Sequence, residues 1–151
     1  MGSANESAKP DQAGAAVQQT PIDHIPFLKL IGLQQREAPP GESLLAIELR
    51  DDLCNLLPAA HGGVLMTLLD VAMARAATSN PGAAASTVVT VEMSSRFLRP
   101  GRGPLTAEGR VIHGGGSLCS CEAHVRNAAG EPVASAMGTF KYWRGPVGGV
   151  E

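Results

Sequence analysis

Aromatic residues are scarce in this sequence and account for 3% of its 151 residues. The core must therefore be assembled from aliphatic side chains, and a hydrophobic share of 44% is sufficient for one globular domain. A strong charge is also missing: the net charge is −2, which gives no reason to expect nucleic acid as a partner. No run approaches the roughly 20 apolar residues of a membrane span, and the N-terminus lacks the apolar segment of a secretion signal. We therefore expect neither a membrane partner nor export.

The cysteines are three in number, Cys54, Cys119 and Cys121, and an odd count does not indicate a disulfide framework. Cys119 and Cys121 alternate on an expected strand but are poorly matched for a bridge. A reduced, cytoplasmic location is the simplest interpretation. A Cys-x-Cys pair near His113 or His124 lacks the usual spacing of zinc ligands, so we expect no metal and no cofactor.

The chain divides into three parts by composition. Residues 1–20 are rich in Ala, Gly, Gln, Ser and Pro and are expected to form a disordered tail. Residues 21–145 are expected to form a single domain. Residues 146–151 are Gly-rich and are expected to form a flexible end.

Hydrophobic periodicity and turn residues predict the secondary structure of the domain. The expected order is a short helix, two strands, one long helix and four strands, at 22–31, 32–38, 43–49, 61–78, 87–98, 105–113, 118–126 and 133–143. This order predicts an α+β fold with an antiparallel sheet and one dominant helix. The spacing is compatible with a meander or with one crossover among the last four strands.

The long helix is apolar nearly all round, which predicts that it is buried on every side. Asp70 then lies in the middle of a buried helix, where an unpaired carboxylate costs several kcal/mol. Burial would also raise its pKa and make it a better base or nucleophile near neutral pH. The alternative is a structural ion pair with a cation such as Arg75, although five residues place Arg75 off the face of Asp70.

Gly62 and Gly63 stand where this helix begins. The first N–H groups of a helix lack internal partners, and glycine lets a ligand oxygen approach them, as in an oxyanion hole; a simple turn would have the same sequence. Asp70 follows Gly63 by seven residues on the same face, roughly 10 Å away at 1.5 Å per residue. One carbonyl carbon cannot contact both, so we expect two antiparallel copies of the helix to share each site across a homodimer interface.

These residues resemble a known family. The stretch from Asn55 to Asp70 is similar to the Asn-x5-His-Gly-Gly-x6-Asp signature of the phenylacetate-degradation type thioesterases. Val91–Pro100, with its Phe-Leu-Arg-Pro ending, is similar to a strand of the same family. The resemblance implies the hotdog fold, in which a curved antiparallel sheet wraps a long helix, and hydrolysis of an acyl- or aryl-acyl-coenzyme A. The homodimer expected from the spacing is compatible with a tetramer built from two dimers.

The resemblance also implies roles for individual residues. Asp70 would be the nucleophile or general base. The backbone N–H of Gly63, with that of Gly62, would polarise the thioester carbonyl. Asn55 would orient the water or the carbonyl, and His61 would shape the thioester end of the site. Thr90 lies near the position where relatives have a Ser or Thr that assists the water.

Each of these assignments has a structural alternative. Asn55 often caps a turn, His61 can simply start the helix, and Thr90 can be an ordinary strand residue.

Two sets of residues are candidates for binding the coenzyme A phosphates. The first is the turn Gly114, Gly115 and Gly116, whose backbone N–H groups can bind phosphate oxygens although relatives often have a basic residue here. The second is the cluster of Arg96 and Arg99 with Arg102 and Arg110. A solvated strand face explains this cluster equally well.

A non-catalytic hotdog protein that binds acyl-coenzyme A or acts as a regulatory or assembly subunit is the alternative function. A hotdog dehydratase is a third, less fitting one, because those enzymes pair a His with a carboxylate. Asp70 favours the enzyme, since a binding protein has no use for such a carboxylate.

Overall fold

The computed structural model describes residues 21–147 of the chain, so the expected tail 1–20 and residues 148–151 of the expected flexible end lie outside the description. Two α-helices, a short 3-10 helix and six strands follow one another along the chain: α1 Pro26–Ile31, β1 Gln34–Arg36, β2 Glu42–Ile47, η1 Asp51–Leu53, α2 Gly62–Ser79, β3 Val88–Phe97, β4 Leu105–Gly114, β5 Leu118–Asn127 and β6 Pro132–Tyr142. Within the described part of the chain, neither helix is long and apolar enough to span a membrane.

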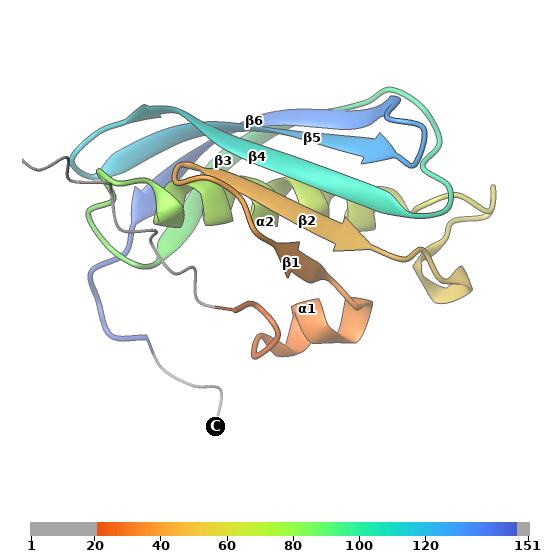
Figure 1. Ribbon diagram of the computed structural model, residues 1–151, viewed down its shortest axis with the longest axis horizontal. Helices are drawn as coiled ribbons and strands as arrows, with labels where there is room; N and C mark the ends of the chain where they lie inside the picture. The colour runs from red at the N-terminus through yellow and green to blue at the C-terminus, as the bar shows by residue number, and fades with distance from the viewer. Residues whose placement is uncertain (1–20, 148–151) are drawn as a thin grey trace, which may run out of the picture.

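The strands form one antiparallel sheet in the order β1-β2-β4-β5-β6-β3. β4, β5 and β6 form a meander, while β3 crosses to the far edge and pairs with β6. The sheet curves over α2, which lies along its concave side (Figure 1). This arrangement confirms the predicted α+β class with one long helix and an antiparallel sheet. It also settles the topology that the spacing left open, in favour of one crossover.

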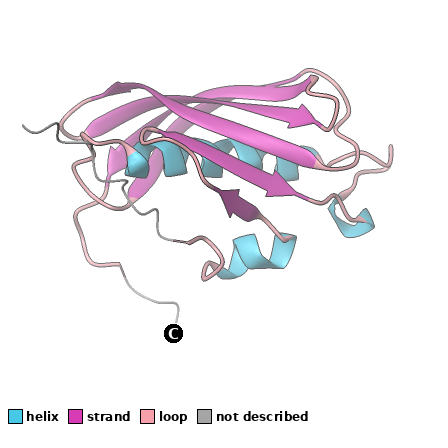
Figure 2. Ribbon diagram, viewed as in Figure 1, coloured by secondary structure: helices cyan, strands magenta, loops and turns pink. Residues whose placement is uncertain are grey.

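The long strands and α2 agree with the expected elements to within one residue at each end. The differences lie in the short pieces: α1 begins at Pro26, a residue favoured in the first turn of a helix, and a 3-10 turn forms in the expected loop before α2. Figure 2 shows how little helix accompanies the sheet apart from α2.

The contact between α2 and the sheet is close at Gly109 of β4. A Cβ added there would lie 2.3 Å from the carbonyl oxygen of Ala72 and 2.7 Å from the hydroxyl of Ser43. That hydroxyl donates a hydrogen bond of 2.7 Å to the same Ala72 oxygen. The sheet can therefore approach the helix backbone only because residue 109 has no side chain.

The expectation that α2 is buried on every side is wrong for the single chain. One face, with Leu68, Leu69 and Ala72 at its centre, packs against the sheet and is fully buried. The opposite face is open: Gly63 and Met66 are exposed, and Asp70 is only half-buried. The reason is that the sheet curves over one side of the helix, and residues 21–147 supply no second layer on the other.

Candidate functional site

The N-terminus of α2 is capped by the residue before it. The Nδ1 atom of His61 accepts a hydrogen bond of 3.0 Å from the backbone N–H of Gly63. The backbone N–H of Gly62 has no hydrogen-bond partner among residues 21–147. The uncommitted donor at this helix end is therefore Gly62, one residue before the glycine that the sequence favoured.

Asn55 lies in the loop that leads into α2. Its Oδ1 accepts a hydrogen bond of 2.8 Å from the backbone N–H of Leu57, so the amide does cap a turn. A backbone N–H requires an acceptor, and this fixes which end of the amide is the oxygen. The side-chain NH2 of Asn55 consequently remains available as a donor.

A cleft of about 310 Å³ brings Asn55 and Gly62 together. Its other walls are mostly apolar and come from the segment after β3 and from the start of α2: Leu57, Ala59, Ala60, Leu65, Phe97, Leu98, Arg99, Pro100 and Gly101. The cleft thus combines two hydrogen-bond donors, the Asn55 amide and the Gly62 N–H, with mostly apolar walls. This is the usual composition of a small-molecule site.

Asp70 belongs to a second cluster, with Thr90 of β3. The hydroxyl of Thr90 donates a hydrogen bond of 2.7 Å to Oδ1 of Asp70. The register of β3 against β6 shifts between Thr90 and Glu92, and such a bulge re-aims side chains. Thr90, a candidate residue from the sequence, therefore contacts the carboxylate of Asp70.

The two clusters are separated along α2 within one chain. Asp70 follows Gly62 by eight residues, which corresponds to about 12 Å of helix. The spacing argument made from the sequence therefore holds with Gly62 in place of Gly63.

The turn at Gly114, Gly115 and Gly116 lies at the other end of the molecule, beside the C-terminal end of α2. A Cβ added at Gly114 would approach Asn80, the residue that ends the helix, to 2.9 Å. In one chain the structure therefore does not bring this turn to the cleft at Gly62.

The four arginines of the expected cluster have different surroundings. Arg99 lines the cleft and pairs with Glu131 at 3.3 Å. Arg110 pairs with Glu122, and Arg102 donates to the carbonyl of Leu57. Arg96 is exposed on β3. Paired charges on strand faces fit the solvated alternative better than one common binding site, apart from Arg99.

Sequence reasoning missed Phe97 and Leu98 as residues of the cleft. Both belong to the Phe-Leu-Arg-Pro segment that supports the family resemblance, but the sequence did not assign them a role. They line the cleft because the crossover brings the end of β3 to the N-terminus of α2. The spacing of the strands did not predict that crossover.

Burial changes the pKa of three groups outside these clusters. It lowers the pKa of Arg75 on α2 and raises that of the Cys121 thiol, whose sulfur lies 3.6 Å from that of Cys119. It also raises the pKa of Tyr142 to about 12.

His124 alternates with Cys119 and Cys121 on β5, and its side chain is exposed on the other face of the sheet. It therefore does not form a set of metal ligands with these cysteines. Within residues 21–147, no group of three His, Cys, Asp or Glu side chains could hold a metal ion.

Comparison with known proteins identifies the family of this chain. The model of the thioesterase superfamily matches residues 57–134, which include the helix with Asp70. A protein of Halobacterium salinarum, whose name assigns it provisionally to the esterases, is 33% identical over 144 residues, covering 89% of this chain and 95% of its own.

Solved structures show the same fold. The PaaI protein from the phenylacetic acid degradation operon of E. coli superimposes with a TM-score of 0.72 at 26% identity, covering 79% of this chain and 85% of that one. A thioesterase family protein from Silicibacter pomeroyi gives 0.73 at 25% identity, covering 80% and 90%. The helix wrapped by the sheet, the paired Asp70 and the matched residues together show that this chain is a hotdog-fold member of the thioesterase superfamily, of the PaaI-like type.

Proposed function

We propose that this protein is an acyl-coenzyme A thioesterase, which hydrolyses the thioester of an acyl- or aryl-acyl-coenzyme A to the free acid and coenzyme A. The observation that supports this most strongly is the Asp70 carboxylate. It stands on the open face of α2 and accepts a hydrogen bond from Thr90. A positioned carboxylate next to a hydroxyl is suited to holding and activating a water molecule.

The chemistry divides between the two clusters. The thioester oxygen accepts hydrogen bonds from the backbone N–H of Gly62 and the side-chain NH2 of Asn55, which stabilise the negative charge that develops on it. We assign this role to Gly62 rather than Gly63 because the N–H of Gly63 is engaged by His61. The place of His61 in the site is thus to hold the first turn of the helix.

Asp70 takes a proton from water while the water oxygen forms a bond to the carbonyl carbon. The carbon–sulfur bond then breaks, and the sulfur leaves with the electron pair as the coenzyme A thiolate. The proton held by Asp70 passes through solvent to the thiolate and restores the carboxylate. Direct attack by Asp70, followed by hydrolysis of the resulting anhydride, uses the same two clusters. Neither route requires a cofactor beyond the substrate.

A homodimer would complete each site. Two features have no partner within the described part of the chain: the open face of α2 and the outer edge of β3. β3 is a ten-residue strand on which Val89 and Val91 are exposed. Long exposed edges tend to pair with another strand. Antiparallel packing of two α2 helices would place Asp70 of one chain beside Gly62 of the other.

Met66 provides a test of this dimer, because it is 43% exposed on the open face of α2. We expect the parent protein to sediment at least as a dimer. Met66→Glu should shift it to monomers and lower thiol release by 10-fold or more, since a buried unpaired charge at the interface costs several kcal/mol. Met66→Leu is the matched control and should preserve both properties. A fully active monomer would contradict the shared site.

The function itself is tested with a panel of acyl- and aryl-acyl-coenzyme A substrates and measurement of free thiol. We expect at least one to be hydrolysed well above the spontaneous rate. The apolar lining of the cleft at Phe97 and Leu98 favours uncharged acyl groups. If the protein binds these compounds tightly but releases no thiol from any of them, it is an acyl-coenzyme A binding protein instead.

A further inference from the structure

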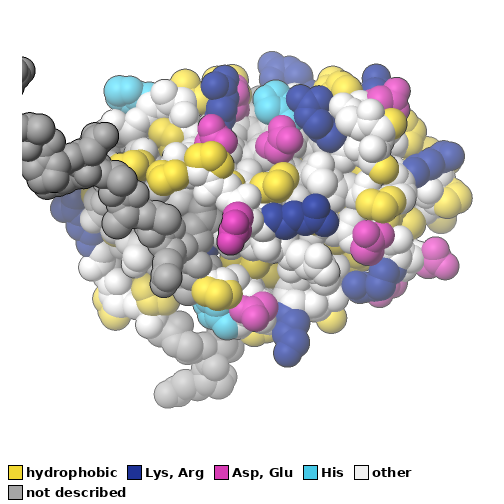
Figure 3. Space-filling model, viewed as in Figure 1, with side chains coloured by type: hydrophobic (Ala, Val, Ile, Leu, Met, Phe, Trp, Pro, Cys, Tyr) yellow, Lys and Arg dark blue, Asp and Glu magenta, His cyan; other side chains and the backbone are white. Residues whose placement is uncertain are grey.

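The loop of residues 55–58 carries Asn55, one of the two donors assigned above to the thioester oxygen. All four of its residues are exposed, and Leu56 and Leu57 are 101% and 67% exposed. Hydrophobic side chains reach the surface at this end of the molecule, at the right of Figure 3. Apolar packing therefore contributes little to fixing the loop, and its position depends on hydrogen bonds.

Pro58 in this loop has an unusual backbone conformation. Its φ is +23°, whereas the proline ring normally holds φ at about −65°. A residue in such a region is strained, and the strain persists only where neighbouring contacts enforce it. Strained residues are concentrated at functional sites, and Pro58 follows Asn55 by three residues. The peptide between Leu57 and Pro58 must therefore be held by groups around it.

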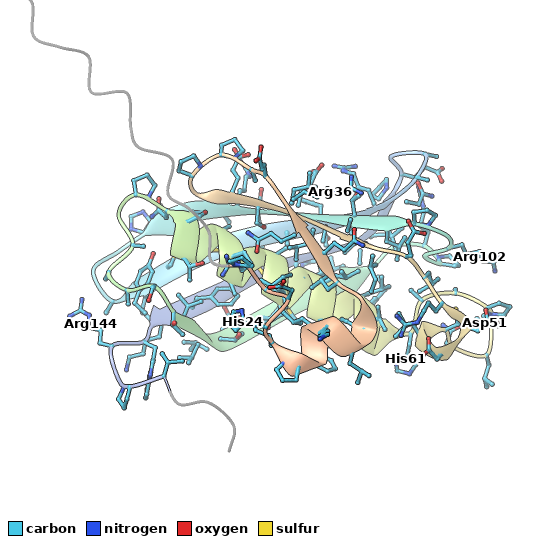
Figure 4. The ribbon with its side chains drawn as sticks, turned by 60° about the horizontal axis from the view of Figure 1, so that its bottom comes forward. His24, Arg36, Asp51, His61, Arg102 and Arg144 are labelled. Atoms are coloured by element: carbon cyan, nitrogen blue, oxygen red, sulfur yellow. The ribbon has the colours of Figure 1, made fainter. Side chains whose placement is uncertain are left out.

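Arg102, in the segment between β3 and β4, holds that peptide. Its Nη2 atom donates a hydrogen bond of 3.3 Å to the carbonyl oxygen of Leu57. Among residues 21–147, this is the one hydrogen bond that reaches residues 55–58 from another segment of the chain. No ion pair of the described residues involves Arg102, so no carboxylate competes with the Leu57 carbonyl. Figure 4 shows Arg102 at the same end of the molecule as His61.

Leu57 connects Arg102 with the side chain of Asn55. The carbonyl of Leu57 accepts the hydrogen bond from Arg102, and its backbone N–H donates one of 2.8 Å to Oδ1 of Asn55. The amide of Asn55 is planar, so a fixed Oδ1 also fixes the direction of the NH2 group. The contact of Arg102 on one side of Leu57 thus determines where the donor on the other side points.

The segment that carries Arg102 is itself closely packed. A Cβ added at Gly101 would lie 3.1 Å from Cγ1 of Val133 and 3.4 Å from Cβ of Ala60. The carbonyl of Gly101 accepts a hydrogen bond of 2.8 Å from the N–H of Ala60, just before α2. Arg102 therefore stands on a backbone that is fixed relative to the first turn of the helix.

We propose that Arg102 is a positioning residue: by holding the carbonyl of Leu57, it places the side-chain NH2 of Asn55 beside the backbone N–H of Gly62 at the cleft. The proposal rests on the proposed thioesterase function, which assigns both donors to the thioester oxygen. Arg102 acts through Asn55 and does not contact the substrate. This role differs from the phosphate binding for which the sequence made the arginine cluster a candidate.

Arg102→Ala should lower kcat for the best acyl-coenzyme A by about 10-fold with KM little changed, because the Asn55 donor remains but loses its fixed direction. Arg102→Lys keeps a donor that can reach the carbonyl and should return kcat to within about threefold of the parent. Arg144→Ala is the matched control. It removes a hydrogen bond of 3.2 Å from an arginine to the carbonyl of Gly116, at the opposite end of the molecule, and should leave kcat unchanged (Figure 4).

The N-acetylcysteamine thioester of the same acid separates positioning from phosphate binding, because it lacks the nucleotide of coenzyme A. Arg102→Ala should lower kcat equally for this compound and for the acyl-coenzyme A. A rise in KM confined to the acyl-coenzyme A, with kcat unchanged, would overturn the proposal and show that Arg102 binds the phosphates.

A double-mutant cycle with Asn55→Ala tests whether Arg102 acts through Asn55. Asn55→Ala alone should lower kcat by about 10²-fold, the cost of losing one oxyanion donor. Arg102→Ala should then cause no further loss, because two changes that act through one group are not additive. A further 10-fold loss in the double variant would overturn the proposal, since Arg102 would then act independently of the amide.

Hydrogen exchange of the Leu57 amide, measured by NMR, gives a readout independent of turnover. We expect Arg102→Ala to speed this exchange by about 10-fold or more, since the loop opens more often, and Arg144→Ala to leave it unchanged. Unchanged exchange together with unchanged kcat in Arg102→Ala would overturn the proposal. Faster exchange in a protein that hydrolyses no thioester would support the positioning contact and contradict the enzymatic function.

Discussion

Asp70→Asn is expected to lower the turnover of an acyl-coenzyme A by at least the 10²–10⁴-fold that accompanies loss of a general base. Asparagine keeps the shape of the side chain and can still accept the hydrogen bond from Thr90. It cannot ionise, attack the carbonyl or take a proton from water. The measurement is thiol release at saturating substrate, and KM should change little because the cleft at Gly62 is untouched.

Stability separates this catalytic role from a structural one. Because Asp70 is only half-buried, Asp70→Asn should change the free energy of unfolding by less than about 1 kcal/mol. A structural ion pair would give the opposite result: turnover would survive, and stability would fall by several kcal/mol as a buried cation lost its partner. Thr90→Val removes only the hydroxyl that positions the carboxylate. It should therefore lower turnover by less than Asp70→Asn does.

Gly109→Ala is expected to destabilise the fold by about 3 kcal/mol or more, at the upper end of the cost of overpacking. The added Cβ would overlap the backbone of Ala72 in the middle of α2, at 2.3 Å from its oxygen, and a backbone atom cannot move aside as a flexible side chain can. Separation of β4 from the helix would also break the hydrogen bond from Ser43 to Ala72. Thermal or urea unfolding measures the loss.

Gly116→Ala is the matched control for that experiment. No atom lies within 4 Å of a Cβ added at Gly116, and its φ is not in the left-handed region. The same substitution should therefore change stability by no more than a few tenths of a kcal/mol. Equal stability of the two variants would show that β4 and α2 separate without cost, which contradicts the close packing at Gly109.

Local patterns predicted the elements that position the site. Alternation of apolar and polar residues fixed four long strands, and the one long apolar run fixed α2. The spacing from Gly63 to Asp70 predicted two places too far apart for one carbonyl carbon, because a helix converts sequence separation directly into distance, whereas Asn55 entered through the family resemblance. The predicted elements agree with the structure because each depends only on neighbouring residues along the chain.

The hydrogen-bond partners could not be predicted, since each depends on atoms that the fold brings together. Nδ1 of His61 accepts the hydrogen bond from the N–H of Gly63, so the N–H of Gly62 is the one without a described partner. The sequence cannot distinguish these two adjacent glycines. The contact between Thr90 and Asp70 depends on a bulge in β3.

By itself, then, the sequence determined the α+β class, the long helix and the carboxylate at Asp70, because periodicity and spacing along one element are local properties. Only the tertiary structure decided that β3 crosses to the sheet edge, that one face of α2 remains open, and that Arg102 lies beside Leu57. These three features depend on which strands pair and how far the sheet curves. Such pairings join residues far apart in the chain, and no local pattern specifies them.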